Sequence, residues 1–119
     1  MAVEQVSDGV TKEILIPGSG GRPKPGDTVT VHCTGFLINP SKKFWSTKDP
    51  GQKPFSFQVG IGQVIQGWDE GCLTMQKGET SRFTIRSDKS YGPNGFPAWG
   101  IPPNADLQFE IGILAINGQ

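Results

Sequence analysis

Residues 28–34 read TVTVHCT, and apolar and polar side chains alternate along them. The apolar residues fall on one face of an extended chain: Val29, Val31 and Cys33. The threonines and His32 fall on the opposite face. Alternation with a period of two is typical of a β-strand that buries one face and exposes the other. The stretch therefore predicts a half-buried strand, with Cys33 in the core and His32 in solvent.

Further strands are indicated on both sides of this one. Short apolar or alternating segments bounded by turn residues lie at 13–16, 55–59, 83–85 and 107–116. The last segment alternates up to Ile113 and stays apolar beyond it, which is typical of a strand in the middle of a sheet. Residues 19–27 are too rich in glycine and proline for regular structure, and residues 1–12 read as a polar N-terminal segment. We expect about five strands, with antiparallel pairing favoured.

One stretch, residues 63–75, has the period of a helix. Its apolar side chains recur at spacings of three, four and three: Ile65, Trp68, Cys72 and Met75. Gly78 offers a stop, while Gly67 and Gly71 lower the helix propensity. One amphipathic helix beside antiparallel strands can bury both its own apolar stripe and one face of the sheet. The sequence thus predicts an α+β fold, and 119 residues fit one domain.

Charge and composition argue against several classes of partner. Eleven lysines and arginines balance eleven aspartates and glutamates, and no run of like charge suits a phosphate backbone. We therefore expect no nucleic-acid partner. The first ten residues lack the apolar stretch of a signal peptide, and no segment approaches the roughly 20 apolar residues that cross a bilayer. We expect no membrane insertion and a cytoplasmic location, and without a coiled-coil repeat we expect a monomer.

The cysteines and the histidine do not suit a metal site or a covalent mechanism. Cys33 and Cys72 are far apart and outside any Cys-x-x-Cys spacing, so we expect two buried reduced thiols. His32 is the sole histidine, which leaves neither a metal cluster nor a nucleophile–histidine triad to assemble. The sequence predicts no metal and no cofactor.

Two short motifs suggest a phosphate-binding loop and an acid–base pair of carboxylates, but neither has the residues that such a site requires. Residues 60–62 read GIG, yet no lysine follows as a phosphate loop requires, and the βαβ context is missing. Asp69 and Glu70 are adjacent on the predicted helix rather than facing each other across a cleft. We expect these two carboxylates to lie on the solvated face of the helix.

Several motifs resemble, in order, successive signatures of the FKBP family of peptidyl-prolyl cis/trans isomerases, the macrolide-binding immunophilins. These motifs are VHCTG at 31–35, KPFSF at 53–57, VIQGWDEG at 64–71, YG at 91–92 and IPPNA at 101–105. The match runs from about residue 13 to about residue 116 with nearly constant spacing, which chance does not produce. Residues 44–52, FWSTKDPGQ, are similar to the wording of small single-domain plant members.

The resemblance implies a fold and an activity. The implied fold is a twisted antiparallel sheet that curls around one short helix, with an apolar pocket between them and residues 1–119 in a single domain. The implied activity is cis/trans isomerisation of X-Pro bonds in peptides and proteins. The implied ligands are macrolides such as tacrolimus and rapamycin, with a phosphatase or a kinase as partner of the drug complex.

The resemblance also implies the roles of particular residues. Trp68 is the pocket floor, the Ile65 backbone N–H receives a carbonyl, and the Tyr91 hydroxyl receives another. The implied catalytic set is Phe44, Ile65, Trp68, Tyr91 and Phe109. The implied ligand-binding set is Cys33, Trp45, Phe55, Gln63, Val64, Phe96, Trp99 and Ile101. Taken without the motifs, each of these aromatic residues reads as core packing.

The chain departs from the family pattern at the pocket. Many members carry a tyrosine in place of Cys33, an aspartate in place of Trp45 and a basic residue in place of Gly51. Losing one polar contact typically costs about 1–3 kcal/mol. We therefore expect the isomerase activity to be retained, because it depends mainly on the apolar pocket. For macrolides, the loss of these polar contacts could lower the affinity.

Two other functions compete with the isomerase. A non-catalytic module could use the same pocket to dock a Leu-Pro-like segment. A carbohydrate-binding module could use Trp45 and Trp99 as stacking platforms, since both lie in segments dense with proline, glycine and polar residues, where surface loops are expected.

Overall fold

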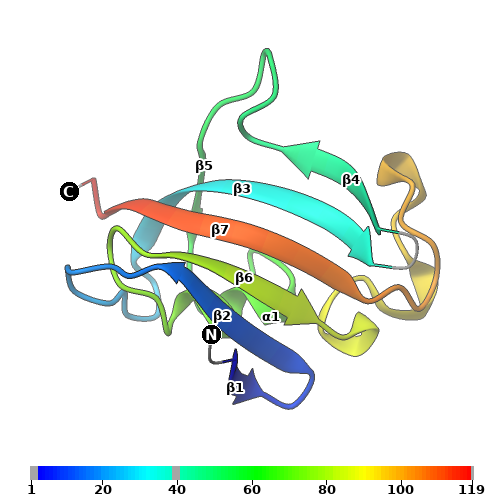
Figure 1. Cartoon of the computed structure of the whole chain (residues 1–119), viewed down its shortest axis with the longest axis horizontal. Coiled ribbons are helices and arrows are strands. Elements are labelled where there is room, and N and C mark those ends of the chain that lie inside the picture. Colours follow the sequence, from blue (N-terminus) through cyan, green and yellow to red (C-terminus); the bar gives the residue numbers. More distant parts are fainter. Residues whose placement is uncertain (1–2, 39–40, 119) are drawn as a thin grey trace.

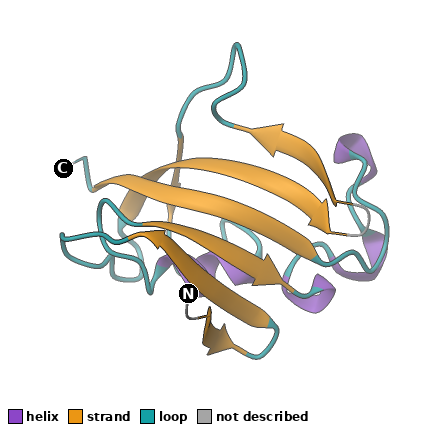
Figure 2. Ribbon diagram, in the orientation of Figure 1, coloured by secondary structure: helices purple, strands orange, loops and turns teal. Residues whose placement is uncertain are grey.

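The computed structural model describes residues 3–38 and 41–118, and it shows one antiparallel sheet with a helix against one face (Figures 1 and 2). The sheet has seven strands in the order β1-β2-β6-β7-β3-β4, and β5 pairs with β3 outside this path. The strands are β1 Val3–Ser7, β2 Val10–Ile16, β3 Thr28–Ile38, β4 Ser41–Ser46, β5 Phe55–Gln58, β6 Thr80–Ile85 and β7 Leu107–Ile116. The α+β class and the antiparallel sheet are confirmed, whereas the expected number of about five strands was too low.

The unexpected strands are β1 and β4. β1 forms a hairpin with β2 in the N-terminal segment that we expected to be only polar, and Gly9, at φ +85°, turns the chain between them. The pattern was hidden because Lys12 occupies an inward position of β2 and is only 3% exposed. β4 carries the sequence SKKFWS, whose lysines interrupt any apolar alternation. Met1 and Ala2, which also belong to the expected segment, lie outside the described residues.

β3 holds the middle of the sheet together. It pairs with β7 along most of its length, with β5 through Thr28–Val31 and with β4 through Thr34–Ile38. The alternation predicted for this strand is confirmed, because Val29, Val31 and Cys33 are all buried. His32 faces the other side and is half-buried, with its Nδ1 2.9 Å from the Thr47 hydroxyl.

The helix α1 spans Gln66–Cys72, shorter than the predicted 63–75, and it packs against β6. Its internal glycines explain the close approach. A Cβ on Gly67 would lie 2.6 Å from Ile85 Cγ2, and a Cβ on Gly71 would lie 2.6 Å from Phe83 Cε1. The glycines that lower the helix propensity therefore let the backbone of the helix contact the side chains of the sheet. Trp68 and Cys72 of the predicted apolar stripe are buried, as is Met75 just beyond the helix.

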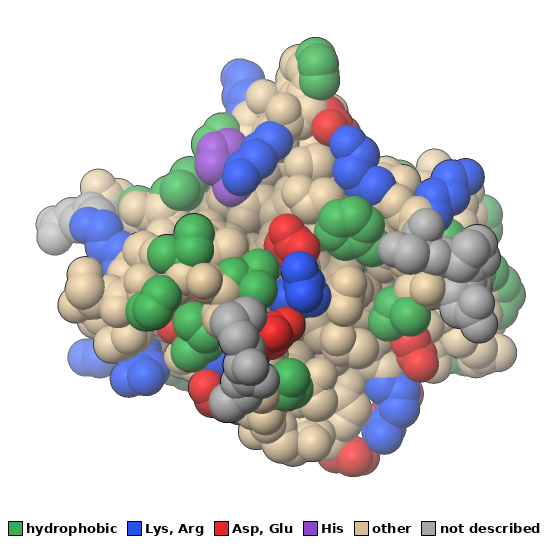
Figure 3. All heavy atoms as spheres, viewed as in Figure 1, with side chains coloured by type: hydrophobic (Ala, Val, Ile, Leu, Met, Phe, Trp, Pro, Cys, Tyr) green, Lys and Arg blue, Asp and Glu red, His purple; other side chains and the backbone are tan. Residues whose placement is uncertain are grey.

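The opposite face of the sheet is turned to solvent. Figure 3 shows hydrophobic side chains and charges of both signs interspersed on it. Arg82 bridges two neighbouring strands, with nitrogen–oxygen distances of 3.2 Å to Glu13 and 3.1 Å to Glu110. No helix among residues 3–38 and 41–118 is long and apolar enough to cross a membrane.

Candidate functional site

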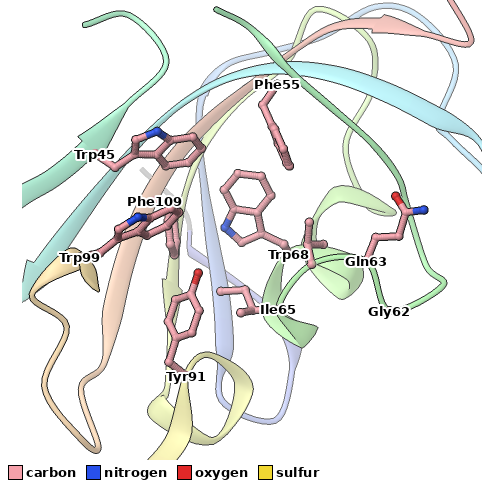
Figure 4. Close-up of a pocket in the computed structure, with 10 residues that line it drawn as sticks. Trp45, Phe55, Gly62, Gln63, Ile65, Trp68, Tyr91, Trp99 and Phe109 are labelled. Atoms are coloured by element: carbon pink, nitrogen blue, oxygen red, sulfur yellow. The ribbon is translucent and has the colours of Figure 1, made fainter. Parts of the chain in front are cut away.

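A cavity of about 510 Å³ opens between the start of α1, the β4 and β5 strands and the loop that follows Ser90 (Figure 4). Its lining is mostly aromatic and contains no charged side chain. The lining residues are Trp45, Phe55, Gly62, Gln63, Val64, Ile65, Trp68, Tyr91, Trp99 and Phe109. Within the described part of the chain, no group of three or more histidine, cysteine or acidic residues could hold a metal ion.

Trp68 forms the bottom of the cavity. Its side chain is 4% exposed and stands edge-on to Phe109, with ring centroids 5.3 Å apart. Phe55 meets it from β5 at 6.1 Å. The Trp68 indole N–H is buried and has no hydrogen-bond partner among the described residues. The floor of the cavity is therefore an indole that water barely reaches.

The rim is a loop that the helix itself holds in place. Both oxygens of Asp69 accept backbone N–H groups, Oδ1 from Gly60 and Oδ2 from Gly62, each at 2.9 Å. Both glycines adopt φ +83°, which favours glycine at these positions. No described residue accepts a hydrogen bond from the Ile65 N–H at the end of this loop. That donor is consequently available to a ligand.

The two helix carboxylates do more than face solvent, so our expectation for them was incomplete. Both are half-buried, and Asp69 shapes the rim as described. Glu70 accepts hydrogen bonds from the Ser7 hydroxyl, from Gln66 at 2.8 Å and from Lys89 at 3.1 Å. Burial raises the pKa of Glu70, but these hydrogen bonds outweigh it and hold the pKa below its ordinary value. Glu70 thereby ties α1 to β1 and to the short helix η1, Ser87–Lys89.

The loop from Tyr91 to Ile101 overhangs the cavity. It contains two single-turn helices, η2 Gly92–Asn94 and η3 Pro97–Trp99. Phe96 and Ile101 close η3 with two backbone hydrogen bonds, of 2.9 and 3.1 Å. Tyr91 points its hydroxyl into the cavity (Figure 4), where no described residue bonds to it, and burial raises its pKa. The loop thus supplies a second free donor.

The structure brings most of the predicted site residues together and leaves four outside the lining. Cys33 is buried in the core, and burial raises the pKa of its thiol to about 12. Ile101 is also buried, below the overhanging loop. Phe44 lies against lining residues, with its ring centroid 6.2 Å from that of Trp99 and 5.8 Å from that of Phe109. Phe96 likewise stacks on Tyr91 at 5.3 Å.

Gly35 explains how the aromatic residues around β3 fit together. A Cβ on Gly35 would lie 2.6 Å from Phe44 Cζ and 2.9 Å from Phe109 Cε1. The absent side chain therefore leaves room for Phe109, which lines the cavity, and for Phe44 behind the lining. Gly62, a lining residue that we did not predict, could have been found only from the tertiary position of its loop.

Trp45 does not lie in a surface loop as we expected. It belongs to β4, is half-buried, and stacks on Trp99 with ring centroids 5.5 Å apart and ring planes inclined by 20°. The two tryptophans that we considered as stacking platforms of a carbohydrate-binding module therefore stack on each other. Gly51 does not line the cavity, and it adopts φ +83° in the turn before β5.

A sheet wrapped on one short helix, with an uncharged aromatic cavity and two free donors, defines a non-covalent binding site rather than an acid–base centre. The chain belongs to the family of FKBP-type peptidyl-prolyl cis-trans isomerases, whose family model matches residues 20–114. The activity predicted from the sequence is confirmed with it: the protein is a peptidyl-prolyl cis/trans isomerase.

Individual relatives agree with this assignment. The chain is 60% identical over 110 residues to the peptidyl-prolyl cis-trans isomerase FKBP12 of Arabidopsis thaliana, an alignment that covers 91% of this chain and 98% of that protein. It is 57% identical over 108 residues to FKBP12 of Vicia faba, covering 89% and 96%. A crystal structure of a peptidyl-prolyl isomerase from Pseudomonas syringae pv. tomato superposes with a TM-score of 0.84 at 32% identity, covering 96% of this chain and 80% of that one.

Proposed function

We propose that the aromatic cavity is the active site and that it acts without covalent chemistry. Rotation about an X-Pro bond meets a barrier of roughly 20 kcal/mol, because amide resonance is lost in the twisted transition state. A rate gain of about four decades requires only about 5–6 kcal/mol of selective binding to that state. The observation that carries the proposal is the uncharged aromatic lining with two unpaired donors.

The proline ring occupies the bottom of the cavity. Trp68 offers it a nearly dehydrated surface, with Phe109 and Phe55 beside it. Removing water from the substrate carbonyl disfavours the planar, charge-separated form of the amide. The same walls accept the ring in its rotated geometry, which is the geometry that the enzyme must favour.

Two donors orient the substrate backbone in this proposal. The Ile65 N–H binds one substrate carbonyl, and the Tyr91 hydroxyl binds the carbonyl of the residue before the proline. Cys33, Phe44, Phe96 and Ile101 act from behind the lining, because they contact or support its residues without bordering the cavity. We assign positioning roles to these four.

The same cavity binds macrolides in our proposal, although less tightly than in members that carry an aspartate in place of Trp45. Its volume and uncharged lining suit an apolar ligand. Trp45 supplies no carboxylate to a ligand hydroxyl. A composite surface that the tacrolimus or rapamycin complex offers to a phosphatase or a kinase is part of the proposal, as are a cytoplasmic location and a single domain over residues 1–119.

The test is the cis-to-trans relaxation of a Leu-Pro peptide at increasing enzyme concentration, because the uncatalysed step takes tens of seconds. We expect the rate to rise linearly with the concentration of the enzyme. Tyr91→Phe removes one hydrogen bond and should lower kcat/KM by about three- to tenfold. Ile16→Ala, at an exposed position of β2, serves as the control. An equal kcat/KM for wild type and Tyr91→Phe would show that the Tyr91 hydroxyl does not contribute to catalysis.

A further inference from the structure

Trp45 and Trp99 form an aromatic pair at the mouth of the cavity. The two indoles come from different segments, β4 and η3, and they stack with ring centroids 5.5 Å apart. Trp99 remains 41% exposed despite this contact. The pair is therefore a wall of the cavity with free aromatic surface.

Both members of the pair are held by contacts within the protein, and the Trp99 ring also packs against that of Phe96, with ring centroids 5.0 Å apart. Trp45 is paired with Gly35 of β3, and the next two residues along the chain, Ser46 and Thr47, are buried. The Trp99 N–H donates to the Phe96 carbonyl at 3.0 Å, within the closed loop. A rigid aromatic surface loses little conformational entropy when a ligand binds to it.

The pair lies beside the donor that we assign to the residue before the proline. The Tyr91 ring meets Trp99 edge-on, with ring centroids 6.5 Å apart. This step rests on the proposed function. If the Tyr91 hydroxyl binds the carbonyl of the residue before the proline, the side chain of that residue lies against the exposed surface of Trp99. The pyrrolidine ring itself occupies the deeper position over Trp68.

We propose that the Trp45–Trp99 pair is a specificity element that selects an aromatic side chain at the residue before the proline. Aromatic rings gain energy from stacked or edge-to-face contact beyond the area that they bury, whereas an aliphatic ring of the same shape gains only the area term. A cationic side chain would lose hydration beside a lining that contains no carboxylate. The selection is therefore for aromaticity itself, beyond size.

The experiment compares peptides that differ only in the residue before the proline: phenylalanine, cyclohexylalanine, leucine or lysine. Cyclohexylalanine has the shape of phenylalanine without its π-system. Isomerisation is measured by NMR exchange, which needs no coupled protease. We expect kcat/KM for the phenylalanine peptide to exceed that for the cyclohexylalanine peptide by about two- to tenfold.

Variants locate the effect in the pair. Trp99→Leu and, independently, Trp45→Leu should bring the phenylalanine-to-cyclohexylalanine ratio close to one, while Trp99→Phe should retain most of it. Leu114→Ala, at an exposed position of β7, should leave the ratio unchanged. Thermal unfolding of each variant verifies that it is folded, and the two leucine variants provide separate tests should one fail to fold.

Three results would overturn the proposal: a wild-type ratio near one, a ratio that survives both leucine variants, or a lysine peptide that is processed faster than the phenylalanine peptide. The last result would indicate cation–π recognition instead. Failure to isomerise any peptide would overturn the proposed function as well, which distinguishes it from a failure of this inference alone.

Discussion

Lys12 and Glu79 form an ion pair inside the core, with Nζ 3.1 Å from Oε2 and side chains only 3% and 2% exposed. Both side chains also make hydrogen bonds to neighbouring groups. Glu79 also accepts hydrogen bonds from Ser81 Oγ at 2.7 Å and from the Gln76 N–H at 3.1 Å, and Lys12 reaches the Thr74 carbonyl. The pair thus joins β2 to the turn that leads from α1 into β6.

Removing one member of this pair should be costly. Lys12→Met leaves a buried carboxylate without its cation, so we expect the free energy of unfolding to fall by about 3–5 kcal/mol. Urea denaturation measures this change. The double variant Lys12→Met with Glu79→Gln should be more stable than Lys12→Met alone, because the uncompensated charge is gone. A double variant that is less stable than both single variants would contradict this account.

Gly67→Ala tests the close approach of the helix to the sheet. Alanine should stabilise a helix by about 1 kcal/mol over glycine. Its Cβ would, however, lie 2.6 Å from Ile85, and overpacking typically costs about 1–3 kcal/mol. We expect net destabilisation in thermal and urea unfolding. Gly21→Ala has no atom within 4 Å of the new Cβ and is the matched control, with an expected effect near zero.

Asp69→Ala should affect catalysis through the rim loop. The Gly60 and Gly62 N–H groups lose their acceptor, and the loop that presents the Ile65 N–H is released. We expect kcat/KM for a Leu-Pro peptide to fall by roughly tenfold, mostly through KM. Asp69→Asn retains one acceptor oxygen and should lose less. Glu70→Gln, one residue further along the helix, should leave kcat/KM within about twofold of wild type; a larger loss there would mean that the effect is not specific to the rim.

The pH dependence of the reaction should be flat. Tyr91 is the one titratable side chain among the described lining residues, and burial raises its pKa above the ordinary value of 10.0. A hydroxyl donates only below its pKa, so a raised pKa extends the active range toward alkaline pH. We expect kcat/KM to stay within about twofold between about pH 6 and pH 9. A bell-shaped profile in this range would indicate a titrating catalytic group elsewhere.

Local patterns predicted much of the fold. The alternation of Val29, Val31 and Cys33 identified the central strand, and the spacing of Trp68, Cys72 and Met75 identified the buried side of the helical region. The hairpin of β1 and β2 was not predicted, because an inward position of β2 carries Lys12. The burial of Lys12 depends on Glu79, which is 67 residues away in the sequence. The sequence separation of such pairs hides them from any local pattern.

The candidate site was less accessible to sequence reasoning. The motifs identified residues around the cavity. A motif does not show, however, which of these residues line the cavity and which only pack against the lining. Phe44 and Trp45 are neighbours in β4, and the rings of both approach Trp99, yet only Trp45 borders the cavity. The register of β4 against β3 shifts between Lys43 and Trp45, so simple alternation does not predict which of the two lines the cavity. The stacking of Trp45 on Trp99 also depends on the closed loop of η3, which has no regular period.

One strand sets the spacing of the outer cavity wall. In the register of β3, Val31 is opposite Phe55 and Gly35 is opposite Trp45, about 13 Å apart along the strand. The two side chains nevertheless lean together, with ring centroids 6.2 Å apart. The separation of these two wall residues therefore depends on the twist of β3 between Val31 and Gly35. Evolution could tune the ligand range of this enzyme by bending that strand, without exchanging any side chain that a ligand contacts.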